Sequence, residues 1–149
     1  MFLTVHGAIG IIIGQRIQNP IFAFFLGLIA HYIFDAIPHG DSRTPQNWKG
    51  MMFLISAAAI DILTLGSLLL IFYQRIEFLK PSVYWAFFGS LLPDFFQAIY
   101  LTSNKKFLKL HQKLHNFFHF LIAKKYEWKF TTGLILQIIF FIILLTFIV

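Results

Sequence analysis

The sequence predicts an all-α protein, a polytopic membrane helix bundle with five to six membrane helices in a single integral membrane domain, residues 1–149. Composition is the first reason: hydrophobic residues make up 58% of the chain, against about 45–50% in soluble domains. Apolar runs are the second, because several approach the roughly 20 residues that a spanning helix needs. We therefore expect an integral membrane protein rather than a soluble enzyme.

The basic residues favour lipid over nucleic acid as the anionic neighbour. The formal net charge is +6, but Lys and Arg stand at the ends of the apolar runs, where they anchor helices at the headgroups. Membrane lipids are the expected partners, no nucleic acid is expected, and the oligomeric state is left open.

The chain has no cysteine, which excludes thiolate metal ligands. The first run lacks a basic start and carries His6, so we expect no cleaved signal peptide.

Five apolar runs predict membrane helices, and prolines mark some of their boundaries. The second run opens at Pro20 and closes at Pro38, as expected of helix ends. The fourth contains Pro93, which removes a backbone donor and predicts a kink. The runs cover residues 1–15, 20–38, 51–73, 83–101 and 131–149.

Residues 107–123 carry two polar stripes, which allow two placements. At 3.6 residues per turn, Lys106, Lys109 and Lys113 share one face, and the three histidines of the segment lie roughly opposite. The segment either crosses or dips into the bilayer, with its lysines reaching the interface, or it is an amphipathic helix lying on anionic lipid. The sequence leaves both placements open.

Ionisable residues gather where the second apolar run ends. His31 and Asp35 are one helical turn apart, and His39 and Asp41 follow just after Pro38. Ionisable groups at this depth are costly without a partner, so they indicate a functional site. A divalent metal ion is the best partner for imidazoles and carboxylates together. A hydrated helix end would explain the last two residues but not the first two.

The other histidines and aspartates join this cluster if the ambiguous segment crosses the bilayer. Alternating crossings then place His6, Asp61, Asp94, His111 and His115 at the same end of the bundle. Asp61 is expected either to orient a ligand imidazole or to act as a general base. His111 and His115 have the i, i+4 spacing of a helical zinc site.

Three short motifs resemble those of a known membrane family. They are His31-x3-Asp35-x2-Pro38-His39, Gly89-Ser-Leu-Leu-Pro93-Asp94 and His111-x3-His115. Together they resemble the YdjM-like membrane-bound metal-dependent hydrolases, which are small multi-helix proteins of the bacterial or archaeal inner membrane. The resemblance implies a multi-pass protein in the cytoplasmic (inner) membrane of a prokaryote.

The chain also departs from that family and resembles a second one locally. Phe95, Phe96 and Gln97 follow the Leu-Pro-Asp motif, where further Asp or His is usual, and His115-Asn116 replaces the usual His-Ser. Separately, His31-Tyr32-x2-Asp35 resembles part of the zinc-dependent phospholipase C signature, in which the His and Asp are zinc ligands. That likeness implies chemistry on phosphoesters.

We therefore expect a metal-dependent hydrolase that cleaves a phosphoester of a lipidic substrate with one or two ions, zinc or alternatively manganese. Such a metal lowers the pKa of a bound water towards about 7 and polarises a phosphoryl oxygen. The predicted metal ligands are His6, His31, Asp35, His39, Asp94, His111 and His115. The predicted catalytic residues are Asp61, His39 and Asp41, and Arg43 and Lys49 are expected to hold the substrate phosphate.

The alternative to this hypothesis is a non-enzymatic membrane protein, either a metal or proton carrier or an assembly factor.

The orientation of the chain in the membrane depends on the number of crossings. With six crossings, the basic residues favour a site that faces outward under the positive-inside rule. If residues 107–123 only lie on the membrane surface, that preference disappears.

Overall fold

The computed structural model describes residues 1–40, 51–72, 80–103 and 105–148, and within them the chain forms six α-helices and no β-strand. The all-α prediction is confirmed. The predicted runs differ from the observed helix ends by a few residues. The helices are α1 (Leu3–Arg16), α2 (Pro20–Asp35), α3 (Met51–Phe72), α4 (Pro81–Thr102), α5 (Lys109–Tyr126) and α6 (Phe130–Leu145).

The ends of α2 determine where its polar residues lie. The helix opens on Pro20, and the Asn19 side chain accepts a hydrogen bond from the Phe22 N–H at 3.0 Å, which caps the first turn. It ends at Asp35, before the Pro38 that we expected to close it. His39 therefore lies beyond the helix and approaches Asp35 from the following segment.

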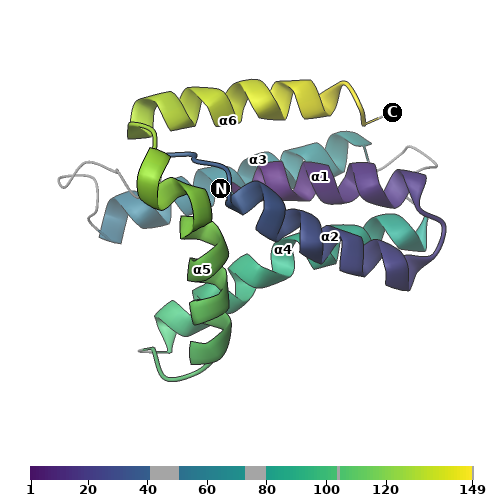
Figure 1. The fold of residues 1–149 in the computed structure, drawn as a ribbon. Coiled ribbons are helices and arrows are strands. Elements are labelled where there is room, and N and C mark those ends of the chain that lie inside the picture. Colours follow the sequence, from purple (N-terminus) through teal and green to yellow (C-terminus); the bar gives the residue numbers. More distant parts are fainter. Residues whose placement is uncertain (41–50, 73–79, 104, 149) are drawn as a thin grey trace.

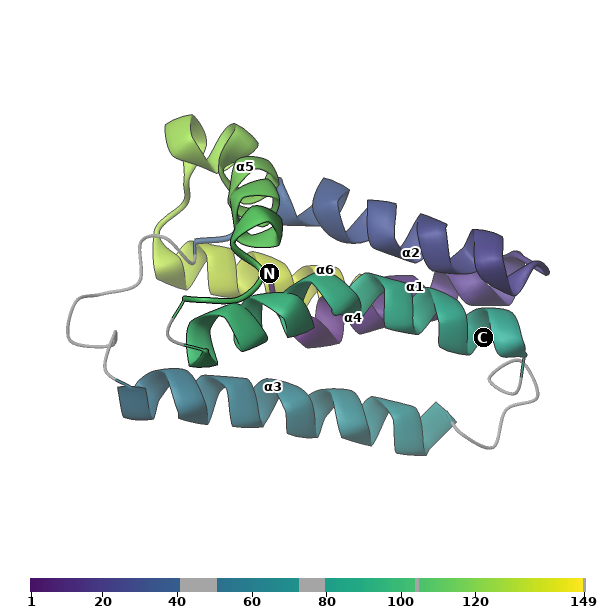
Figure 2. The same cartoon turned by 90° about the horizontal axis from the view of Figure 1, so that it is seen from below.

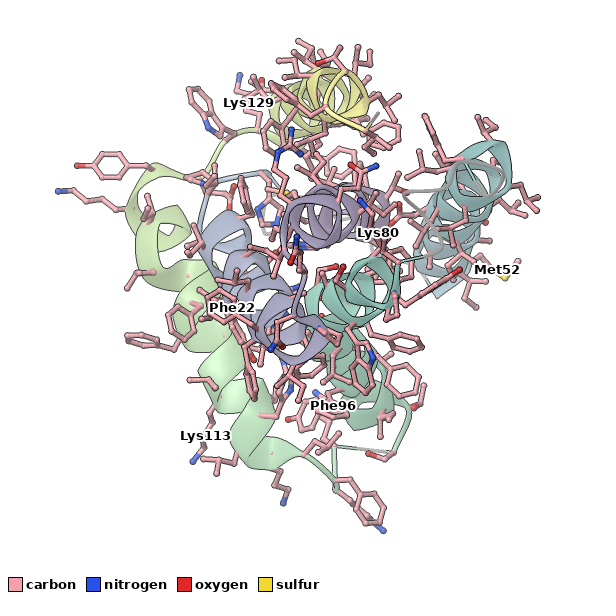
Figure 3. The ribbon with its side chains drawn as sticks, turned by 90° about the vertical axis from the view of Figure 1, so that its right-hand side faces the viewer. Phe22, Met52, Lys80, Phe96, Lys113 and Lys129 are labelled. Atoms are coloured by element: carbon pink, nitrogen blue, oxygen red, sulfur yellow. The ribbon has the colours of Figure 1, made fainter. Side chains whose placement is uncertain are left out.

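Five of the six helices run in roughly one direction, and α5 runs across them (Figures 1 and 2). Seen along the bundle in Figure 3, α1 lies at the centre, with α2, α3, α4 and α6 around it. The start of α1 and the end of α2 lie at the same end of the bundle, beside α5. This arrangement brings polar residues from different helices together at that end.

Glycines allow α1, α2 and α4 to approach one another closely. A Cβ at Gly27 of α2 would collide with the backbone of α4 at Ala86, and one at Gly89 of α4 would collide with the backbone of α2. Gly10 and Gly14 place α1 against α4 in the same way. Small residues at contact points let helices pack backbone to backbone in lipid. These crossings position the three helices that carry most of the polar cluster.

The outer surface of the bundle is apolar. On α2 the exposed large side chains follow the spacing of one helical face; they are Ile21, Phe22, Phe25, Ile29 and Ile33. The opposite face, which includes His31 and Asp35, is buried. Large apolar side chains are also exposed on α3 and α6, and Met52 of α3 points away from the bundle in Figure 3. The chain thus buries its polar face and exposes large apolar residues.

One helix is long and apolar enough to cross a membrane by length and composition. It is α3, in which only 11% of the residues of the stretch Ile55–Phe72 are buried. The apolar helices α2 and α6 are shorter, at 16 residues each. Among the described residues, the structure therefore supports one candidate membrane span, and the prediction of five to six is not confirmed.

Candidate metal centre

Histidines and aspartates from four helices meet at the end of the bundle where α1 begins and α2 ends. His6 comes from the start of α1, His31 and Asp35 from the last turns of α2, and Asp94 from α4. His115 comes from α5, which crosses the bundle at this point (Figure 1). Apart from Asp94, which is partly exposed, these side chains are almost fully buried. The cluster is therefore enclosed by protein.

Four ligand atoms of this cluster lie at separations that suit one metal ion. His115 Nε2 lies 3.5 Å from His31 Nε2 and 3.5 Å from Asp35 Oδ2. Asp94 Oδ1 lies 3.3 Å from His115 Nε2 and 3.9 Å from His31 Nε2. Ligand atoms bound at about 2.0–2.1 Å around a tetrahedral zinc ion lie roughly 3.4 Å from one another. His31, His115 and Asp94 therefore have all their mutual separations in the range expected for ligands of one ion, and Asp35 Oδ2 is equally close to His115 Nε2.

The cluster also offers overlapping sets of ligands. Three groups of three side chains have ligand atoms within 4.8 Å of one another; they are His6, His31 and Asp94; His31, Asp35 and His115; and Asp35, His39 and His119. The first and third groups share no residue. The described residues could therefore hold one divalent ion or two.

Backbone carbonyls orient two of the imidazoles. His31 Nδ1 lies 2.8 Å from the Ser90 carbonyl of α4, and His39 Nδ1 lies 2.7 Å from the Ile37 carbonyl. A carbonyl only accepts, so in each pair the ring nitrogen is the donor and Nε2 is left with its lone pair. Metal-binding histidines are commonly held in this way. His31 thus presents the nitrogen that a metal needs, whereas Nε2 of His39 faces the amino group of Met1 at 2.9 Å.

Several buried polar atoms of the cluster have no hydrogen-bond partner among the described residues. They are both ring nitrogens of His6, Oδ2 of Asp35 and Nδ1 of His115. Leaving a buried polar group unpaired costs about 1–3 kcal/mol, so native structures contain few of them. A coordinated ion would supply the missing partner to His6 and Asp35, and the donor set therefore fits a divalent cation.

A positive charge already lies against Asp35. The amino group of Met1 is 2.6 Å from Asp35 Oδ1 and 2.9 Å from His39 Nε2. His6 Nε2 lies 3.5 Å from the same carboxylate oxygen. A buried carboxylate is stable only when it is paired or hydrogen-bonded. The Asp35 carboxylate is thus surrounded by groups that are cationic or can become so.

The histidines of α5 divide between the centre and its edge. His119, which was not among the predicted ligands, belongs to one of the three groups of ligand atoms. His111, which was predicted as a ligand, belongs to none of them and lies 3.4 Å from the Tyr32 hydroxyl. Partial burial and the neighbouring His115 lower the pKa of His111. The i, i+4 spacing predicts the shared face but not how far each ring reaches into the cluster.

Asp61 lies at the start of α1 and caps that helix. Its carboxylate accepts hydrogen bonds from the Leu3 N–H at 2.6 Å, from the Thr4 N–H at 3.0 Å and from the Thr4 hydroxyl. A carboxylate at a helix N-terminus satisfies free N–H groups and suits the helix dipole. These contacts explain the carboxylate as a cap supplied by α3, and they do not support its assignment as an imidazole partner or a base.

Two polar residues that the sequence did not single out hold the segment that carries His39. The Gln137 side chain on α6 donates to the His39 carbonyl at 3.1 Å and accepts from the Phe2 N–H at 2.9 Å. The Gly40 N–H donates to Glu127 at 2.6 Å. Gly40 has a φ of +89°, which favours glycine there. In the sequence, a Gln within an otherwise apolar helix was the signal for these contacts.

The remaining predicted residues, Asp41, Arg43 and Lys49, lie outside the described residues. Comparisons with models of protein families, with curated proteins and with solved structures find no match to this chain. The geometry of the cluster therefore carries the functional argument.

Proposed function

We propose that this chain is a multi-pass protein of the cytoplasmic (inner) membrane of a prokaryote, with α1, α2, α3, α4 and α6 crossing the bilayer. The distribution of polarity supports this placement, since large apolar side chains cover the outside and His6, His31 and Asp35 are buried inside. Exposed apolar patches of this extent are rare on soluble monomers. The likeness of the His31, Asp94 and His115 motifs to those of YdjM-like hydrolases agrees with it.

The polar cluster, in this proposal, holds one or two divalent ions, zinc or alternatively manganese. His and carboxylate ligands with no thiolate suit both ions. The observation that carries the proposal is the set of separations of 3.3–3.5 Å between His115 Nε2 and ligand atoms of His31, Asp35 and Asp94. Two ligand groups that share no residue leave room for a second ion.

The reaction that this centre supports best is hydrolysis of a phosphoester of a lipidic substrate. A divalent ion would supply a hydroxide at neutral pH and polarise the phosphoryl oxygen. His39 and His119, whose ring centroids are 4.8 Å apart, share a ligand group with Asp35 but not with Asp94, and either imidazole can take or return a proton. Asp94 is the partly exposed member of the cluster, and a lipid headgroup could reach the centre from its side.

Metal content provides the first test, and α5 offers a matched pair of variants. We expect the untagged protein, purified in detergent and loaded with zinc or manganese, to retain at least one ion per chain by elemental analysis. His115→Ala should lose that ion, because its Nε2 is central to the ligand set. His111→Ala, one turn away at the edge, should retain it. Equal retention in both variants, or no stoichiometric metal in the wild type, would contradict the proposed centre.

Hydrolysis is then tested separately on the loaded protein. We expect cleavage of lipid phosphoesters reconstituted in vesicles, measured as release of phosphate or of the phosphorylated headgroup, and its loss in His115→Ala. A protein that binds metal stoichiometrically but cleaves none of these substrates would favour the non-enzymatic carrier over the hydrolase.

A further inference from the structure

Helix α5 differs from the other five helices in direction. It runs across the bundle at the end that holds the His/Asp cluster (Figures 1 and 2), and it packs against α2 and α4 there. If the other helices cross the bilayer, as proposed above, a helix perpendicular to them lies along the membrane plane. Its contacts with Tyr32 in α2 and with Asp94 and Phe96 in α4 all fall in the second halves of those helices, so α5 lies on the side of the bundle where α2 and α4 end.

The two faces of α5 have different neighbours. Gln112 and His115 on the inner face are buried against the bundle. The outer face exposes Leu110, Leu114, Phe117 and Leu121, which recur at the spacing of one helical face. This stripe is large and apolar, with Leu110 81% exposed and Phe117 60% exposed. It is covered by nothing within the described part of the chain.

Basic and aromatic residues flank the apolar stripe. Lys109 and Lys113 are exposed one turn apart, and Lys113 points away from the bundle in Figure 3. Tyr126 and Trp128 are exposed where α5 ends. Helices that lie in the interface combine an apolar face with flanking lysines, and Tyr and Trp are typical of that layer. Lysines beside an apolar face complement anionic phospholipid headgroups.

The basic residues also distinguish the two sides of the bundle. With α5 on the surface and five crossings, the end that holds the cluster carries seven of the nine Lys and Arg residues in the described part of the chain. These are Lys105, Lys106, Lys109, Lys113, Lys124, Lys125 and Lys129, whereas Arg16 and Lys80 belong to the other end. Cytoplasmic segments near membrane helices carry the excess of Lys and Arg. The outward preference expected for six crossings is thereby reversed.

We infer that α5 lies in the headgroup layer of the cytoplasmic leaflet, with its lysines on anionic phospholipid, so that the side of the bundle that holds the His/Asp cluster faces the cytoplasm. This inference rests on the membrane placement proposed above but not on the metal or the hydrolysis. The occupant of the apolar stripe is lipid, because lysines flank it on a helix that runs in the membrane plane. A second copy of the chain covering the stripe is the competing outcome.

The cysteine-free sequence permits a direct test of the side. Lys113→Cys on α5 and Arg16→Cys at the opposite end, both exposed, are made in the full chain and labelled with a membrane-impermeant maleimide in sealed vesicles of known orientation. We expect Lys113→Cys to react only when the cytoplasmic face is outside, and Arg16→Cys only when the opposite face is outside. The reverse pattern would overturn the cytoplasmic assignment. Labelling of both variants from one face would overturn the five-crossing placement.

A second measurement tests the lipid contact. Leu114→Cys carrying an environment-sensitive dye is reconstituted in vesicles of phosphatidylcholine, with or without phosphatidylglycerol. We expect an aqueous quencher to reach the dye less well when the anionic lipid is present, and this protection to disappear in the Lys109→Glu, Lys113→Glu background. It should also weaken near 1 M salt, where the Debye length is about 3 Å. Protection that depends on protein concentration and not on anionic lipid would instead show a second copy on α5.

These results remain separate from those on the metal. A protein without metal that still gives the expected labelling would contradict the proposed centre and leave the placement of α5 intact. A protein that binds metal stoichiometrically but gives the reverse labelling would leave the proposed centre intact and contradict the placement of α5.

Discussion

The α1–α2–α4 core and helix α3 differ in what lies at their surfaces. In the core, backbones meet at Gly27 and Gly89, and polar ligands are enclosed between the helices. On α3, a Cβ added at Gly66 would meet no other described atom within 4 Å, and large apolar side chains such as Leu63 and Leu70 are exposed. The core is held by close fit, whereas α3 mostly presents an apolar surface and touches α1 through Leu65, Leu68 and Asp61.

This difference shows how a chain rich in large apolar residues builds a polar centre. Small residues, not large ones, make the closest contacts, because they let helices approach until ligands from different helices meet. The large side chains are left for the outside.

The largest expected effect compares glycines in the two regions. Gly27→Ala should lower the free energy of unfolding by about 1–3 kcal/mol, because the added Cβ collides with the α4 backbone. Gly66→Ala should leave stability unchanged or raise it by up to about 1 kcal/mol, since alanine favours a helix and the space is open. Thermal unfolding in detergent measures both. Equal losses would mean that the contrast in packing is wrong.

A smaller effect tests the polar link between α3 and α1. Asp61→Ala should destabilise the protein by about 1–2 kcal/mol, the usual cost of removing a helix cap. Ser67→Ala, also on α3, is the control, because its exposed hydroxyl bonds only to the preceding turn of its own helix. If Asp61 instead acts as a base, Asp61→Ala would abolish hydrolysis without a comparable loss of stability.

The smallest expected effect concerns Gln137 on α6, which donates a hydrogen bond to the His39 carbonyl. Gln137→Leu should weaken metal binding about tenfold, because second-sphere partners typically contribute that much and the His39 carbonyl loses its donor. Metal titration of the purified variant measures the change. Ile138→Leu, at an exposed neighbouring position, should bind metal as the wild type does. If Gln137→Leu binds the metal with unchanged affinity, His39 is not one of the metal ligands.

Much of the fold and of the cluster follows from the sequence. Long apolar runs bounded by prolines predict helices, and the alternation of successive helices brings His6, His31, Asp35 and Asp94 to one end. Because ionisable residues are costly in an apolar helix, their positions also indicate that they are partnered. The few His and Asp residues of this apolar chain were therefore the most informative part of the sequence for predicting the site.

The rest depended on contacts that a pattern cannot specify. A stripe of histidines opposite lysines gives the same sequence signature for a crossing helix and for one lying flat, so the direction of α5 stayed open. Asp61 and Asp35 are both carboxylates in apolar helices, yet one contacts backbone N–H groups and the other contacts imidazoles. Their roles differ through their neighbours, not through their local sequence.

The short length of α2 has a consequence for the surrounding lipid. With 16 residues, α2 extends about 24 Å at 1.5 Å per residue, less than the roughly 30 Å of a typical hydrocarbon core. With 22 residues, α3 reaches about 33 Å. If both cross the same bilayer, hydrophobic mismatch draws the leaflets together beside α2 and not beside α3. Headgroups next to α2 would then sink towards the ligand end of that helix, so that a lipid approaches the cluster without leaving its leaflet.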